Sequence, residues 1–425
     1  MNNLKILFVS HDPFSVIGSN GKTYLSLFSD FNDNDIAQLY FNNLYPSTTK
    51  FNNFFRIREV DILKLKFLFH KISGKVADIN VHEIKPQYGK RSIFKSELIK
   101  IIRNFIFSLI DITKINNLDK WINDFEPDVI FFVGANYIFQ YKSILDISRR
   151  YNIPYSIYFT DDYFIYNNGN NFITKFLHQR FVLKNKPIVE GAKELFVISP
   201  KMKNEYELYF NKKCSILINA IDKKDITPTI NKFNTPIILR YFGWLHSNRS
   251  SSLGILGQCL QYINDNYKYD CVLEVYSLSE LTEDCKNNFA INTIKICEPL
   301  MGEAYQDVLQ SSNFLVHAES FDEAYTQITM LSISTKIPEY LLSNRCIIAI
   351  GPPELASISV LEENNLAIVL SKEKTINENS LQILRVIEDK EMYNQYCERA
   401  IKYCRSEFNS VKMRKSLKEK LSQVK

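Results

Sequence analysis

Short apolar runs alternate along the chain with longer stretches of mixed character. In the first half these runs cover residues 4–9, 127–133, 153–159 and 194–199, and polar side chains follow each of them. Brief apolar runs of this kind are typical of strands buried in a parallel sheet. Their alternation with helix-like segments predicts a doubly wound α/β domain, whose ligands bind where the strands end.

The second half repeats this pattern after a polar stretch at residues 223–235, which we interpret as a linker. The predicted strands there cover residues 236–242, 272–276, 294–296, 314–316, 346–350 and 366–370. A chain of 425 residues is too long for one ordinary core. We therefore expect two domains, at residues 1–222 and 236–405.

Composition excludes several classes of protein. The net charge of +5 is small for this length and gives no support to nucleic-acid binding, although it suits an anionic substrate or membrane surface. All eight cysteines lie at or after Cys214 without a Cys-x-x-Cys pair, which favours a reducing compartment over disulfides or zinc. The first apolar run is too short for a signal peptide, and no run approaches the ~20 residues of a membrane span. We expect a cytoplasmic protein.

Two basic segments, residues 61–75 and 96–111, mix lysine or arginine with large apolar residues. One interpretation places them on the inner face of a membrane as amphipathic helices. The other packs each helix on a sheet, with its lysines in water, and is the commoner arrangement. We favour the second interpretation and keep peripheral membrane contact open.

The stretch from residue 312 to 353 carries the densest chemistry. His317, Glu319 and Ser320 follow the strand predicted at 314–316, and a loop at 321–333 comes next. A helix is then expected, because Ser334 or Thr335 is a good N-cap and Pro338 is tolerated only in a first helical turn. This helix should stop near residue 343, before the strand at 346–350.

A helix start with free backbone N–H groups and Lys336 is suited to a phosphate. Glu339 lies about one turn further along, within reach of a hydroxyl-rich group beside that phosphate. A nucleotide-sugar fits this arrangement, with its ribose on Glu339 and its sugar toward Glu319. The alternative is an ordinary strand–loop–helix–strand unit with capping residues and a solvent-facing glutamate, and the residue types alone leave both open.

The segment Ser-Thr-Lys-Ile-Pro-Glu-Tyr-Leu-Leu-Ser-Asn-Arg-Cys-Ile-Ile-Ala-Ile-Gly-Pro, residues 334–352, resembles retaining GT-B glycosyltransferases of the family 4 type. Members usually read Lys-x-x-Glu-Tyr-(Leu/Met)-Ala-x-Gly-(Lys/Arg)-Pro-(Ile/Val) there. Asn344 replaces the glycine and Cys346 the proline, and Leu331 stands where a Glu-x7-Glu pair has its first acid. The resemblance then implies that Glu319 or Glu323 takes the role of this acid.

A second motif supports the same resemblance. Gly243-Trp-Leu-His-Ser-Asn-Arg249 is similar to the family's Gly-Arg-Leu-x-x-x-Lys, with Arg249 at the lysine position and Trp244 replacing the arginine. A guanidinium can bind a phosphate through two hydrogen bonds. The resemblance implies a donor site whose residues are Gly243, Arg249, Ser334, Thr335, Lys336 and Glu339.

The first half contains a glycine-rich loop, Gly18-Ser-Asn-Gly21-Lys-Thr. It is not a phosphate loop of the Walker type, because Val16 stands where that pattern needs glycine. Gly18, Asn20 and Gly21 resemble the family's glycine pair near the acceptor and the donor phosphates. A tight turn between strand and helix needs glycine in any case, so this structural explanation stays open.

Asp161 and Asp162 follow the strand predicted at 153–159, where relatives often have His-Asp and this chain has Thr160. Adjacent acids of this kind could bind acceptor hydroxyls or assist proton transfer. They could equally cap the next helix. Both interpretations remain.

The resemblance implies an α/β fold of the GT-B type, two Rossmann-like domains facing a cleft, with a terminal helix at 410–425 returning to the first domain. It implies transfer of a sugar from a nucleotide-sugar to a sugar or lipid-linked glycan acceptor, in surface polysaccharide synthesis, without metal or cofactor. Glu319, Asp161, Arg249 and Lys336 would be catalytic. The replacements at Leu331 and Thr160 keep an inactive GT-B scaffold as an alternative, beside an epimerase or phosphorylase on the same fold.

Overall fold

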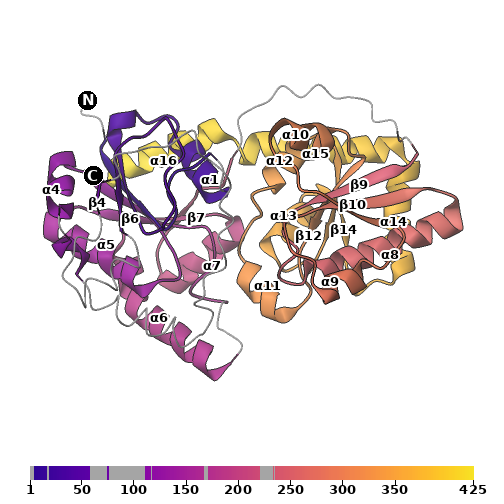
Figure 1. The fold of residues 1–425 in the computed structure, drawn as a ribbon, viewed down its shortest axis with the longest axis horizontal. Helices are drawn as coiled ribbons and strands as arrows, with labels where there is room; N and C mark the ends of the chain where they lie inside the picture. Colours follow the sequence, from indigo (N-terminus) through magenta and orange to yellow (C-terminus); the bar gives the residue numbers. More distant parts are fainter. Residues whose placement is uncertain are drawn as a thin grey trace. The chain divides into compact units, whose positions relative to one another are not determined.

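A computed structural model of the chain describes residues 4–16, 19–57, 74–75, 111–115, 117–166, 171–220, 233 and 235–425. Contacts divide it into two compact units (Figure 1). Unit 1 comprises Met1–Ala220 together with Ser410–Lys425, and unit 2 comprises Ile221–Asn409. The basic segments at 61–75 and 96–111 and the linker at 223–235 lie almost wholly outside the described residues.

Unit 1 is built on an eight-stranded sheet, as far as the described residues show, in the order β4-β3-β2-β1-β5-β6-β7-β8. Every pair is parallel except β3 with β4 at the edge. The strands are β1 (Ile6–Ser10), β2 (Ile36–Tyr40), β3 (Phe54–Arg56), β4 (Gly74–Lys75), β5 (Val129–Val133), β6 (Tyr155–Phe159), β7 (Glu194–Val197) and β8 (Cys214–Ile216). The central strands are buried throughout, which explains their continuous apolar sequence.

Helices and 3-10 turns connect these strands. They are α1 (Ser19–Leu27), η1 (Asp33–Asp35), η2 (Ile112–Lys114), α4 (Leu118–Phe125), α5 (Ile138–Tyr151), α6 (Phe172–Gly191), α7 (Pro200–Phe210) and α16 (Ser410–Val424). The terminal helix α16 packs against unit 1, since Met413, Leu417 and Leu421 join the cluster that contains Phe8, Phe28 and Phe131. Ser199 caps α7 by accepting a hydrogen bond from the Met202 N–H at 2.9 Å, as the sequence predicts.

Unit 2 has a six-stranded parallel sheet in the order β11-β10-β9-β12-β13-β14. Its strands are β9 (Ile237–Phe242), β10 (Cys271–Tyr276), β11 (Ile294–Cys297), β12 (Phe314–Ala318), β13 (Cys346–Ile350) and β14 (Ala367–Leu370). Its helices are α8 (Arg249–Tyr267), α9 (Glu283–Asn288), α10 (Gly302–Gln310), α11 (Glu323–Thr329), α12 (Ile337–Leu342), α13 (Ala356–Glu363), α14 (Ile376–Glu388) and α15 (Lys390–Glu407). Strand order reverses between β9 and β12, which is where doubly wound sheets bind ligands.

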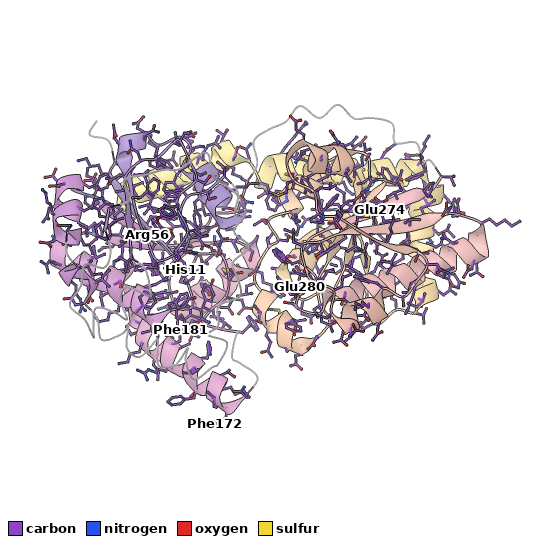
Figure 2. The ribbon with its side chains drawn as sticks, in the orientation of Figure 1. His11, Arg56, Phe172, Phe181, Glu274 and Glu280 are labelled. Carbon is purple, nitrogen blue, oxygen red and sulfur yellow. The ribbon has the colours of Figure 1, made fainter. Side chains whose placement is uncertain are left out.

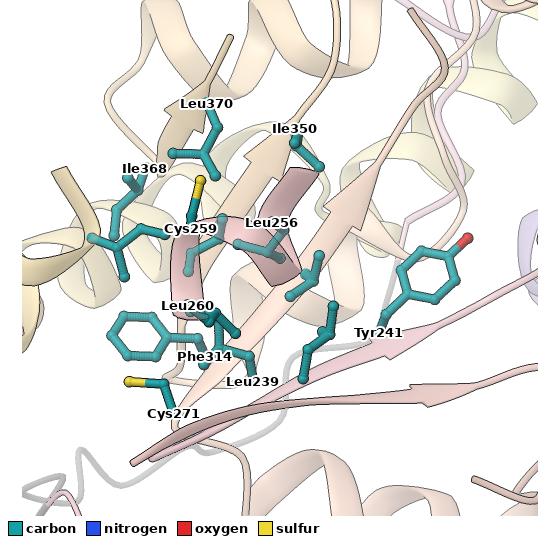
Figure 3. Close-up of a cluster of buried hydrophobic side chains, with 14 of the residues drawn as sticks. Leu239, Tyr241, Leu256, Cys259, Leu260, Cys271, Phe314, Ile350, Ile368 and Leu370 are labelled. Carbon is teal, nitrogen blue, oxygen red and sulfur yellow. The ribbon is translucent and has the colours of Figure 1, made fainter. Parts of the chain in front are cut away.

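The core of unit 2 forms where α8 crosses the sheet (Figure 3). Leu256, Cys259 and Leu260 of α8 meet Leu239, Phe314 and Ile350 from three neighbouring strands, and all six are buried. Packing along α8 fixes the place of its first residue, Arg249, beside the strand ends.

The structure corrects three details of the sequence interpretation. The stretch expected as a loop at 321–333 contains α11, which begins after Asp322 caps the Ala324 N–H. The next helix, α12, begins at Ile337 with Lys336 at its N-cap, so neither Ser334 nor Thr335 caps it. Strand β12 extends through His317 to Ala318, which makes His317 a buried strand residue. The end of β12 lies later than local propensity predicts because pairing with β13 prolongs the strand.

Among the residues described, no helix combines the length and the apolar content that crossing a membrane requires.

Candidate active site

The strongest candidate site lies in unit 2, where β9 and β12 end. Arg249 is the first residue of α8, and its guanidinium binds the Glu319 carboxylate just beyond β12, with Nη2 at 2.9 Å and Nε at 3.3 Å from Oε2. Glu319 is only 4% exposed. A third residue, Ser252, donates a hydrogen bond to the Glu319 carbonyl at 2.6 Å. Strand and helix are therefore tied together at this point.

The Arg249 guanidinium remains charged in this buried place. Burial alone would lower its pKa, but Glu319 and the Tyr241 hydroxyl outweigh burial and raise the pKa above its ordinary value. The N-cap of α8, Asn248, makes no side-chain capping hydrogen bond. A 19-residue helix whose first turn carries a fixed guanidinium is a favourable place for an anion.

His317 lies behind this pair on β12. Its Nε2 is 3.4 Å from Glu319 Oε1 and has no hydrogen-bond partner among the described residues. Burial lowers the pKa of His317, Arg249 lowers it further, and Glu319 opposes both, with the net shift downward. The imidazole is therefore neutral at pH 7. Of the two side chains beside Glu319, only Arg249 carries a positive charge.

Glu339 forms a second polar group on α12. Its Oε2 accepts a hydrogen bond from the Tyr305 hydroxyl at 2.7 Å, and its Oε1 accepts one from the Gln306 amide at 2.8 Å. A carboxylate has about four acceptor positions, so each oxygen retains one. Two helices, α10 and α12, thus hold Glu339 with acceptor capacity left for two hydroxyls.

Lys336 lies beside Glu339, and its ammonium is 5.4 Å from the centre of the Tyr305 ring. The same ring packs edge-on against Phe242 at the end of β9, with 4.9 Å between ring centres. Phe242 follows Tyr241, whose hydroxyl interacts with Arg249. Side chains of consecutive strand residues point to opposite faces of a sheet. The Arg249–Glu319 pair and the Lys336–Glu339 group therefore contact β9 from opposite faces at its carboxyl end.

The remaining predicted donor residues are also in this region. Ser334 and Thr335 form the turn before α12, where the Ser334 carbonyl accepts from the Ile337 N–H at 3.1 Å and Thr335 is exposed. Gly243 follows β9, and a Cβ built there would lie 2.7 Å from the Tyr241 hydroxyl. Glu323 is exposed at the first residue of α11, and Leu331 is fully buried.

Unit 1 presents a different polar cluster at the ends of β1 and β2. The Asp12 carboxylate accepts hydrogen bonds from the amides of Asn20, at 3.0 Å, and Asn42, at 2.7 Å. Gly21, next to Asn20, is required for packing, because an added Cβ would lie 2.6 Å from Ser15 N. Gly21 lies within α1 and not in a tight turn, so close packing against Ser15, rather than the expected turn, explains this glycine. Gly18 lies outside the described residues.

His11 precedes Asp12 and lies within unit 1 (Figure 2). Its Nδ1 is 3.2 Å from the Gln140 amide nitrogen, and its ring stacks on Tyr137 with 5.2 Å between ring centres. The sequence analysis missed His11, Asp12, Asn42 and Gln140. They are scattered over 130 positions. Only the fold brings together His11, Asp12 and Asn42, which follow neighbouring strands, and Gln140, which lies on α5.

The two adjacent aspartates after β6 have different surroundings. Asp162 is buried, and its carboxylate accepts from the N–H groups of Phe164, Ile165 and Tyr166 and from the Tyr206 hydroxyl. It organises residues 164–166 and does not cap the next helix, α6, whose N-cap is Asn171. The interpretation of Asp162 as a helix cap is therefore wrong.

Asp161 is exposed and accepts long hydrogen bonds from neighbouring hydroxyls. Burial first, and then the carboxylates of Asp12 and Asp161, raise the pKa of Tyr24, which keeps that hydroxyl protonated. The carboxylates of Asp12 and Asp161 therefore both act electrostatically on the Tyr24 hydroxyl.

The described part of the chain contains no group of three or more His, Cys, Asp or Glu side chains arranged to hold a metal ion.

Comparison with known proteins identifies the fold. No family model matches the sequence, and no curated protein matches it either. Several solved structures are similar to it. Sucrose-phosphate synthase from Thermosynechococcus elongatus is 11% identical with a TM-score of 0.64, covering 99% of each chain. Anabaena HepE, solved in complex with UDP-glucose, is 11% identical with a TM-score of 0.62, over 99% of this chain and all of its own.

A glycosyltransferase from Rickettsia africae is also similar, at 11% identity and a TM-score of 0.60, covering 100% of this chain and 99% of its own. Identities this low demonstrate the fold alone. The two parallel sheets and these full-length matches confirm the architecture expected from the sequence: the chain has the GT-B fold, with two Rossmann-like units.

Proposed function

We propose that this protein is a retaining glycosyltransferase that transfers a sugar from a nucleotide-sugar to an acceptor hydroxyl. The observation that carries the proposal is the Arg249 guanidinium, which buried Glu319 holds at the first turn of α8 where two parallel strands end. Structurally similar proteins include HepE, solved with UDP-glucose, so a UDP-sugar is the first donor to test.

The donor diphosphate would bind Arg249, Lys336 and the backbone of the Ser334–Thr335 turn. Negative charge develops on this diphosphate as the sugar leaves, so fixed cations there stabilise the transition state more than the ground state. Two cations can supply this stabilisation without a metal ion, and we propose a metal-independent reaction with no cofactor.

The ribose would bind Glu339, whose two remaining acceptor positions suit the 2′- and 3′-hydroxyls. Glu319 is buried and paired, so we assign it the orientation of Arg249. Glu323, exposed on α11, is then the carboxylate open to the transferred sugar.

The acceptor would bind unit 1. Asp161 is exposed there, and Asn20, in the first turn of α1 beside Gly21, donates a hydrogen bond to Asp12. Carboxylates and amides that form hydrogen bonds with hydroxyls suit a sugar or a lipid-linked glycan. A cytoplasmic enzyme of surface polysaccharide synthesis, in peripheral contact with the inner face of a membrane, is the biological setting we propose.

The test is a thermal unfolding screen of the full chain against UDP, GDP, ADP, CMP and their common sugar conjugates, without and with Mg²⁺. A ligand at 100 times its dissociation constant should stabilise the fold by about 2.7 kcal/mol. Binding of one nucleotide without Mg²⁺, lost in Glu339→Ala but kept in the exposed control Glu362→Ala, supports the proposal. A cooperative transition that no nucleotide shifts would instead indicate the inactive scaffold, which the replacements at Leu331 and Thr160 favour.

A further inference from the structure

Helix α6 of unit 1 exposes large apolar side chains along its first three turns. Phe172 is 85% exposed, Leu183 is 75% exposed, and Ile173 and Phe176 are each more than half exposed. In Figure 2, Phe172 projects from the tip of α6, whereas Phe181 lies toward the body of the unit. Exposed apolar side chains that gather on one helix mark an interaction surface, unlike scattered ones.

Three of these four residues form one stripe with exposed Gln179, and Ile173 lies to one side of it. Phe172, Phe176, Gln179 and Leu183 are spaced by four, three and four residues, which places them along the same side of a helix. The opposite side already packs against the unit through buried Phe181, Asn185, Ile188 and Val189. The outward stripe is therefore additional to the core-facing side of α6.

Cations flank the stripe on both sides. At 100° per residue, Lys175 and Lys186 lie on one side of the stripe and Arg180 and Lys184 on the other. Residues 171–189 contain no aspartate or glutamate. Neighbouring α7 differs, because it exposes one large apolar side chain, Leu208, and carries as many glutamates as lysines. Glu190, in the last turn of α6, pairs with Lys186 at 4.0 Å, so the helix carries four lysine or arginine side chains against one glutamate. Apolar exposure and a net positive charge coincide on α6.

We propose that α6 binds the surface of a membrane that contains anionic phospholipids. Its stripe of Phe172, Phe176 and Leu183 enters the boundary between headgroups and acyl chains, while the flanking lysines reach the phosphates. The positive charge beside the stripe distinguishes between two candidate partners, an anionic membrane and a second copy of this chain. A symmetric contact between two copies of α6 would bring the same cations face to face, whereas anionic headgroups neutralise them.

The test is co-sedimentation of the full chain with phosphatidylcholine vesicles containing 30% phosphatidylglycerol, compared with pure phosphatidylcholine vesicles. Neither donor nor acceptor is added, so the result is independent of the proposed reaction. We expect binding to the anionic vesicles, weakened by salt. The variant Phe172→Ser/Leu183→Ser should bind at least about tenfold more weakly, because it removes two large apolar side chains from the membrane boundary.

Two matched controls keep the proposal falsifiable. Val411→Ser changes an exposed apolar side chain on α16, 59% exposed, and should leave vesicle binding unchanged. Lys184→Gln should weaken binding about fivefold, as expected for one cation near an anionic surface, whereas Lys120→Gln on α4 should not. Equal binding to both kinds of vesicle, or parent-like binding of the double variant, would overturn the proposal. So would absence of vesicle binding with a dimer in sedimentation that the double variant abolishes, since the stripe would then join two copies.

Discussion

The two units use carboxylates in opposite ways. In unit 2, Glu319 is buried and compensated by the charged Arg249, and Glu339 is held by two side chains from another helix. In unit 1, Asp12 is held by neutral amides and Asp161 is exposed. A buried carboxylate that fixes a guanidinium prepares a site for phosphate charge. Partly exposed carboxylates held by neutral groups are suited to hydroxyls. The difference separates a candidate donor site from a candidate acceptor site.

The largest effect should come from breaking the buried pair. Arg249→Ala leaves Glu319 buried without its cation, which should destabilise the protein by about 3 kcal/mol and reduce turnover about 10²-fold or more. Urea unfolding and a nucleotide-release assay measure the two effects. The double variant Arg249→Met/Glu319→Gln should recover most of the stability and none of the turnover. Full activity in that folded double variant would exclude Arg249 from the reaction.

The adjacent aspartates of unit 1 offer a matched pair. Asp162→Ala leaves three backbone N–H groups and the Tyr206 hydroxyl without their acceptor, and should cost about 2–3 kcal/mol of unfolding free energy. Asp161→Ala should leave stability within about 0.5 kcal/mol of the parent, since it changes an exposed side chain, but lower turnover with the acceptor. Equal stability losses in both variants would contradict the division of roles.

Glu339→Ala tests the ribose site. It removes acceptors of hydrogen bonds to a charged group, each worth about 1.5–3 kcal/mol, so nucleotide affinity should fall roughly 10- to 100-fold. Calorimetric titration with the nucleotide found in the thermal screen measures it. Glu362→Ala, an exposed glutamate on α13, is the control. If both variants bound nucleotide like the parent, the ribose would have to lie elsewhere.

The smallest effect concerns His317 and pH. Because burial lowers its pKa below that of the unfolded chain, near 6.5, the unfolded state binds the extra proton first. The stability that neutral His317 contributes is present above pH 6.5 and is lost as pH falls toward the folded-state pKa. Between pH 7.5 and 5.5 this loss is at most about 1.4 kcal/mol. His317→Gln should reduce the pH dependence of the urea midpoint, and an unchanged pH dependence would show that His317 does not titrate as proposed.

Much of the architecture was predictable because it rests on local pattern. Apolar runs such as Val129–Val133 and Cys346–Ile350 are buried parallel strands, as expected. The turn of residues 334–336 was misjudged, because Ser334 and Thr335 satisfy local rules for an N-cap while the chain there turns once more before α12 begins. No helix was predicted for the segment that forms α6. Apolar residues occur on both its inward and its outward side, so it lacks the one-sided pattern of a helix that packs on a sheet.

The candidate site likewise contains residues that the sequence predicted and residues that only the structure revealed. The residues that were predicted, Arg249, Lys336 and Glu339, lie in contiguous motifs whose resemblance to a family is visible in one dimension. Tyr305 and Gln306, which hold Glu339, lie more than thirty positions upstream without a motif.

The sequence by itself determined the alternation of strands and helices, the division into two halves and the identities of the charged groups, because periodicity and composition are local properties. Only the tertiary structure decided which charges meet. The pairing of Arg249 with Glu319 across 70 positions follows from β9 and β12 lying side by side. Because Glu319 is buried, loss of Arg249 would leave its charge without compensation. The tertiary structure also decided which side of α6 faces outward, because packing against the unit buries only the opposite side.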